Sequence, residues 1–85
     1  MTYRVVIMSE AVHQIGKMDA PLRERVRAAI DRLRIEPEIG KRLKGLLTGR
    51  WSYRVGDWRL LHKFDRGRLL IMVLTVGHRR EVYRR

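Results

Sequence analysis

Two arginines placed across an expected hairpin are the residues of this sequence best suited to bind an anion. Segment 51–59 reads as two short strands joined by a turn at Gly56-Asp57, where glycine supplies the positive φ that a type II′ turn requires. In this register Arg54 stands opposite Arg59, and like charges placed opposite each other destabilise an antiparallel pair. A bound anion would offset that repulsion, so we predict an anion-binding site on the hairpin.

Side chains alternate between the two faces of a strand, so the two arginines share a face with Ser52 and Leu61. We predict that this face carries the site. The opposite face is mostly apolar and is expected to pack in the core or at its rim, including both tryptophans, although tryptophan also stacks on nucleic-acid bases. Its members are Trp51, Tyr53, Val55, Trp58, Leu60 and His62.

The charge of the chain points to a polyanion. Its 85 residues hold 20 Lys and Arg against 9 Asp and Glu, a net charge of +11. Residues 1–40 have a net charge of +1 and residues 41–85 of +10. Because the basic half reads as strands and not as a basic amphipathic helix, we expect nucleic acid and not a membrane surface. The alternative is solvated arginines that serve solubility, and for Lys41, Arg42 and Lys44 phosphate contact and simple solvation stay equally open.

Several other kinds of chemistry have no support in the sequence. Without cysteine there is no disulfide or thiolate metal site, and the 3 scattered histidines lack neighbouring carboxylates, so no metal is expected. We find no glycine-rich phosphate loop, Ser-His-Asp order or paired carboxylates and expect no small-molecule cofactor. No apolar run is long enough for a signal peptide or a membrane span. The prediction is a cytoplasmic protein without a membrane partner.

The elements that position the hairpin follow from apolar patterns. Residues 3–8 are rich in β-branched and apolar residues on both parities, which predicts a strand covered on both faces or at the centre of a sheet. Residues 69–76 are almost continuously apolar, which predicts a strand buried on both faces. Ser9 and Asp19 are expected to cap two helices. The second helix has an apolar stripe and charges of both signs, read as a solvated surface or one where a partner docks. The apolar stripe consists of Leu22, Val26, Ala29, Ile30 and Leu33.

These elements predict one α+β domain over residues 1–85, with the order β-α-α-β-β-β. A small, mostly antiparallel sheet is expected to carry the two N-terminal helices on one face. Leu43, Leu46 and Leu47 are expected to reach the core from a short helical turn. Gly77 is expected to end the last strand and to release a basic tail over residues 78–85.

This order, together with the segments KRLKG, YRVGDWRLL and VLTVGHRREVY, resembles the RelE toxins of toxin-antitoxin modules, in the RelE/ParE superfamily. The similarity covers essentially the whole chain. Its most specific parts are the R-x-G-D-aromatic-R hairpin and the closing GHRREVY. The resemblance implies a ribosome-dependent endoribonuclease that cleaves messenger RNA. Its implied partners are the ribosome, the messenger RNA and a cognate antitoxin that neutralises it.

Carried over residue by residue, the resemblance matches Arg54 and Arg59 to the family's basic strand residues, Arg79 to the arginine after the last strand and Tyr83 to the C-terminal aromatic residue. The chain departs from the pattern at two positions. Ser52 stands where RelE proteins often have a lysine, and His62 where a tyrosine is usual. The predicted RNA-binding set around the catalytic residues consists of Lys41, Arg42, Lys44, Ser52 and Arg80.

Cleavage of RNA without a metal uses the neighbouring 2′-hydroxyl as the nucleophile. The site must orient that group, accept its proton, stabilise the charged phosphorane and protonate the leaving 5′ oxygen. Arginine does not release a proton, but its planar fork fits phosphate oxygens, so we assign Arg54, Arg59 and Arg79 to phosphate binding. Tyr83 becomes a candidate base if these cations lower its pKa. His78 is the alternative, as base or acid, because histidines titrate near neutrality.

Two other functions stay open at this level. A ParE-like protein of the same fold would bind and inhibit DNA gyrase without cutting RNA. A weakened RelE homologue would bind RNA or ribosomes without cleavage. The GHRREVY ending and Arg59 favour the nuclease over the ParE-like inhibitor, whereas Ser52 favours the weakened homologue.

Overall fold

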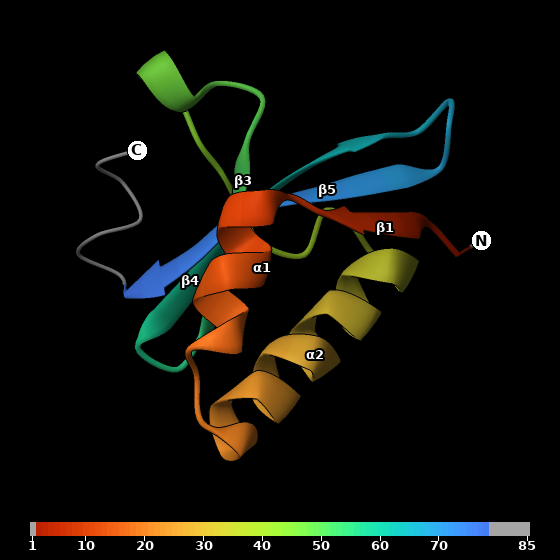
Figure 1. Ribbon diagram of the computed structural model, residues 1–85. Coiled ribbons are helices and arrows are strands. Elements are labelled where there is room, and N and C mark those ends of the chain that lie inside the picture. The colour runs from red at the N-terminus through yellow and green to blue at the C-terminus, as the bar shows by residue number, and fades with distance from the viewer. Residues whose placement is uncertain (1, 79–85) are drawn as a thin grey trace.

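The computed structural model describes residues 2–78 and contains one sheet with two helices packed on one of its faces (Figure 1). The strands follow the order β1-β5-β4-β3-β2 in a five-stranded sheet, and only the pairing of β1 with β5 is parallel. The predicted α+β class, element order and helix placement are confirmed, with the two-residue β2 added. The elements are β1 (Arg4–Ile7), α1 (Ser9–Gly16), α2 (Ala20–Ile35), β2 (Lys41–Arg42), the 3-10 turn η1 (Gly45–Leu47), β3 (Trp51–Val55), β4 (Trp58–Asp65) and β5 (Leu70–His78).

The main core lies between the helices and the sheet. The predicted stripe of α2 is confirmed, since Val26, Ala29, Ile30 and Leu33 are buried and Leu22 packs against them. From the sheet, Leu60 of β4 and the residues of β5 that face the helices meet this stripe. One face of the β3–β4 hairpin thus packs in the core. The arginines lie on the other face of the hairpin. The β5 residues in the core are Ile71, Val73 and Val76.

The start of α2 is capped as predicted. The side chain of Asp19 accepts a hydrogen bond from the backbone N–H of Leu22 at 3.0 Å, which satisfies one of the free donors of the first helical turn. We expect Asp19→Ala to lower the free energy of unfolding by about 1 kcal/mol, measured by urea denaturation. Asp31→Ala, an exposed position inside the same helix, is the control. Equal losses in both variants would contradict a capping role.

Helix α1 begins one residue differently from the prediction. Its N-cap is Met8, without a side-chain cap, and Ser9 is already helical, so the expected cap at Ser9 is wrong. The physical reason is the sheet: the N–H of Met8 donates to the carbonyl of Val73 at 2.9 Å, so pairing with β5 continues up to the residue where the helix starts. The helix ends at Gly16.

The first strand corrects a second prediction. β1 lies at the edge of the sheet beside β5, and Val6 and Ile7 are 46% and 37% exposed. It is neither central nor covered on both faces. An apolar run shows which residues are apolar but not whether another element covers them. The sequence pattern therefore could not distinguish an edge strand from a central or covered one. β5 lies between β1 and β4, and from Leu70 to Thr75 its residues alternate between partly exposed and buried. The predicted burial on both faces is therefore borne out only in part.

A smaller apolar cluster occupies the sheet face away from the helices. Leu43 and Leu61 form it, with Leu47 and Leu74 packed against them. Leu46, which was expected in the core, is instead fully exposed, because η1 projects away from the sheet (Figure 1). The open face is therefore part apolar cluster and part arginine site.

Candidate functional site

The arginine pair has the predicted geometry. Arg54 of β3 pairs with Arg59 of β4, and Val55 pairs with Trp58. Gly56 has φ +61° and Asp57 does not have a positive φ, which is the pattern of a type II′ turn. The two-residue loop therefore sets the register that places the guanidinium groups on one face.

The two arginines differ in their surroundings. Arg54 is exposed, and its Nε donates to the carbonyl of Gly56 at 3.0 Å, so the turn orients its side chain. Arg59 is half-buried and lies in the middle of a row, opposite Arg54 on β3 and Gly77 on β5. Planar guanidinium forks held in this way suit the oxygens of a phosphate group.

The segment between α2 and β3 carries three cations that were predicted to contact phosphate. Strand register places one of them on the same face of the sheet as Arg54 and Arg59. Lys41 pairs with Ser52 and so shares its face with the arginines, whereas Arg42 pairs with Trp51 on the other face. Lys44 precedes η1. All three side chains are exposed, so Lys41 is the connector cation best placed to extend the arginine surface.

Ser52 is held inside the sheet. Its exposed fraction is 2%, and its carbonyl approaches Gly40 so closely that a Cβ at position 40 would lie 2.4 Å from that oxygen. Glycine at position 40 therefore allows the segment between α2 and β2 to pack closely against β3. A side chain so deeply buried does not reach RNA on the surface, and the prediction that Ser52 contacts RNA is not supported.

The sheet separates His78 from the arginine pair. β5 continues through Gly77 to His78, so the prediction that Gly77 ends the strand is wrong. His78 pairs with Trp58, and their rings meet edge to face at 6.3 Å. Trp58 packs against the core, and paired residues lie on the same face, so His78 is on the helix side of the sheet. Arg59 is on the other face. Its predicted role as an acid or base beside the arginines is not supported by this placement.

The tail residues of the predicted site, Arg79, Arg80 and Tyr83, lie outside the described residues. Their roles in phosphate binding and proton transfer therefore stay predictions. β5 ends one residue before Arg79, beside the strand that carries Arg59.

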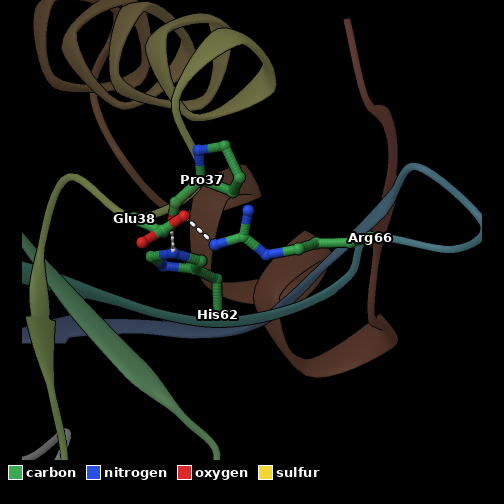
Figure 2. A network of polar contacts seen from close by, with 4 residues as sticks. All are labelled: Pro37, Glu38, His62 and Arg66. Atoms are coloured by element: carbon green, nitrogen blue, oxygen red, sulfur yellow. Dashed lines mark hydrogen bonds and ion pairs between the residues drawn. The ribbon is translucent and has the colours of Figure 1, made fainter. Parts of the chain in front are cut away.

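His62 is a buried core residue, as its face predicted. Its Nε2 lies 2.9 Å from the carbonyl oxygen of Pro37 and donates to it, and its ring stacks on Phe64 at 6.4 Å. Figure 2 shows this contact below the Pro37-Glu38 segment, where Arg66 reaches Glu38 as an ion pair. Nδ1 is buried without a hydrogen-bond partner within residues 2–78. Burial lowers the pKa of His62, and the hydrogen bond to Pro37 opposes this only in part.

We expect the buried His62 to make stability depend on pH. Its folded pKa lies below its ordinary value of 6.5, so the unfolded chain binds the proton more readily, and the free energy of unfolding falls as pH drops below 6.5. The slope approaches about 1.4 kcal/mol per pH unit for one group. Urea denaturation between neutral pH and mildly acidic pH measures it. His62→Phe should flatten the profile and His13→Gln, at an exposed position, should not; identical profiles would contradict this assignment.

Residues 2–78 offer neither a metal-binding cluster nor a membrane-spanning helix. Within that part of the chain, no group of three or more His, Asp or Glu side chains is arranged to hold a metal ion. No helix in this part is long and apolar enough to cross a membrane.

Two arginines of α2 that the sequence reading did not assign to the site also lie beside the hairpin. Arg25 and Arg32 of α2 line a hollow together with Arg54. The two α2 residues are seven apart and thus lie on one side of the helix. The seven-residue spacing could have grouped these two arginines from the sequence alone. It does not show which strand this side of the helix faces.

Solved structures with this architecture include toxins in complex with antitoxins. The chain superposes on the toxin-antitoxin complex RelBE2 from Mycobacterium tuberculosis with a TM-score of 0.85 and 31% identity, over 93% of this chain and 100% of that one. It superposes on the archaeal RelE-RelB complex from Pyrococcus horikoshii with a TM-score of 0.79 and 27% identity, over 95% and 99% of the two chains. The fold and the basic hairpin thus define a toxin of the RelE/ParE superfamily, which confirms the resemblance seen in the sequence.

Residues 5–83 match the family model described as the ParE toxin of the type II toxin-antitoxin system parDE. This chain therefore belongs to the ParE toxin family of type II toxin-antitoxin systems. It is also 40% identical over 47 residues to Toxin RelG from Mycobacterium tuberculosis, a match that covers 55% of this chain and 54% of that toxin. The alignment thus spans about half the length of the curated relative.

Proposed function

We propose that this toxin is a ribosome-dependent endoribonuclease that cleaves messenger RNA in the cytoplasm through attack by the 2′-hydroxyl, without a metal. The observation that supports it most is the opposed pair of Arg54 and Arg59 on the open face of the sheet. The net charge of +10 in residues 41–85 favours a nucleic acid as the target. Three solved relatives were crystallised as RelE toxins with their RelB antitoxins, which supports a cognate antitoxin as the regulatory partner.

In this proposal, the arginines act on charge and another residue moves the proton. Arg59 and Arg54 would hold the phosphate through their forks and stabilise the negative charge that develops on its oxygens. Arg79 would join them from the tail. Tyr83 would accept the proton of the 2′-hydroxyl once these cations lower its pKa, and it is preferred as the base because His78 pairs with Trp58 on the other face of the sheet.

A test adds the purified toxin to translating ribosomes and maps transcript ends by primer extension. The expected result is a set of new ends inside the reading frame that disappears when the cognate antitoxin is added first. Transcripts that stay intact in the presence of folded toxin would contradict the proposal.

The second candidate is inhibition of DNA gyrase, and it is favoured by one observation, the match to the ParE family model. Arg59 and the GHRREVY ending favour the nuclease. A supercoiling assay separates the two functions. Inhibition of gyrase without cleavage of RNA would reverse their order.

A weakened toxin is the third candidate. At position 52, a lysine would add a cation next to the arginine row, whereas this chain buries a serine there. Ser52→Lys tests whether that cation limits activity. Ribosome binding without cleavage in the parent chain, followed by cleavage in the variant, would identify a weakened nuclease.

A further inference from the structure

Helix α2 and strand β3 enclose a basic hollow at the side of the molecule. Its volume is about 340 Å³, and it is lined by Arg25 and Arg32 from the helix and by Arg54 from the strand. β2 pairs only with residues 51 and 52 of β3, so the outer edge of β3 beyond Ser52 borders this hollow. The hollow therefore begins where the pairing of β3 with β2 ends.

The sequence of α2 explains why a hollow exists there. Between the two arginines, the same side of the helix carries Ala28 and Ala29, whose small side chains leave room that a larger residue would fill. At the other wall, Gly56 lets the guanidinium of Arg25 lie against the turn, since a Cβ at position 56 would be 2.9 Å from Arg25 Nη2. Helix and hairpin thus bring three arginines to the lining of one hollow.

No ion pair within the described residues involves the arginines of the hollow. Within residues 2–78, the ion pairs are Arg66 with Glu38 and Arg68 with Asp65, both outside this surface. No carboxylate therefore pairs with Arg25, Arg32 or Arg54 in the described part of the chain. Three cations that converge without a carboxylate repel each other, and an anionic ligand would remove that repulsion.

We propose that Arg25, Arg32 and Arg54 form a phosphate-binding groove that holds the backbone of an RNA strand beside the arginine pair. The inference rests on the proposed function, because Arg54 belongs both to the arginine pair and to the lining of the groove. Tyr53, which is partly buried and lines the groove, offers an aromatic surface for a base. An aromatic surface among guanidinium forks favours RNA over an acidic polypeptide.

The test measures binding of a fluorescent 2′-O-methyl RNA strand by anisotropy over a range of salt concentrations. This strand has no free 2′-hydroxyl and is not cut, so binding is separated from cleavage. For single strands, each lost phosphate contact reduces the slope of log K against log salt by about 0.7. We therefore expect the double variant R25Q/R32Q to bind more weakly with a slope smaller by about 1.4.

The matched control is R23Q/R27Q, which removes the same charge from exposed positions of the same helix. These positions lie on the side of α2 opposite Arg25, so this variant should keep the parent slope. Binding of the same variants to ribosomes distinguishes the source of the phosphates. If the oligonucleotide responds, the groove takes the messenger strand, and if only ribosome binding responds, it takes ribosomal RNA.

Equal behaviour of the two double variants in both assays, including an absence of binding, would overturn the proposal. So would a loss of poly-glutamate binding in R25Q/R32Q with RNA binding unchanged, because the groove would then hold an acidic polypeptide. A parent chain that shows the groove-dependent slope but leaves transcripts intact on the ribosome would contradict the proposed nuclease function and not the groove.

Discussion

Replacing Arg59 with alanine is expected to slow cleavage of messenger RNA on the ribosome by a factor of about 10² to 10³, which corresponds to about 3–4 kcal/mol of transition-state stabilisation. Arg59 lies at the centre of the arginine row, opposite Arg54 and Gly77, and would meet the phosphate oxygens as charge develops on them. The rate of transcript cleavage under single-turnover conditions measures the effect.

Two further variants show what the guanidinium contributes. Arg59→Lys keeps the charge but loses the planar fork, so its rate should fall between those of the parent chain and Arg59→Ala. Arg68→Ala removes a cation from the turn between β4 and β5 and should keep the parent rate. Equal losses of cleavage rate in Arg59→Ala and Arg68→Ala would mean that Arg59 contributes only through the overall positive charge of the protein. Thermal unfolding of each variant checks that the fold is kept.

Replacing Leu33 with alanine is expected to lower the free energy of unfolding by about 2–5 kcal/mol. Leu33 is among the largest fully buried side chains and lies in the core between α2 and the sheet. A domain of this size has a total stability of about 5–15 kcal/mol, so this one change removes a large part of it. The midpoint of urea denaturation should move to a clearly lower concentration.

Leu46 provides the matched control for this prediction. It is the same residue type but is fully exposed on η1, so Leu46→Ala should change stability by less than about 0.5 kcal/mol. A loss at Leu46 similar to that at Leu33 would mean that η1 packs against the protein in solution. That result would restore the sequence-based expectation that Leu46 belongs to a core.

The sequence by itself determined the features that depend on neighbouring residues. Gly56-Asp57 specified a two-residue turn, and such a loop fixes which residues face each other; the pairing of Arg54 with Arg59 followed. The apolar spacing of α2 identified its buried face, and Asp19 identified its first turn. The toxin superfamily could also be recognised from the sequence, because its motifs are short runs of adjacent residues.

Only the tertiary structure decided which faces are covered and which distant side chains meet. It placed β1 at an edge, buried Ser52 and carried β5 far enough to turn His78 away from the arginines. It also brought Arg25 and Arg32 against the hairpin. Periodicity states which residues share a side of one element, whereas the partner of that side depends on how helices and strands pack. The arginine pair is therefore a property of the local sequence, and the groove beside it is a property of the fold.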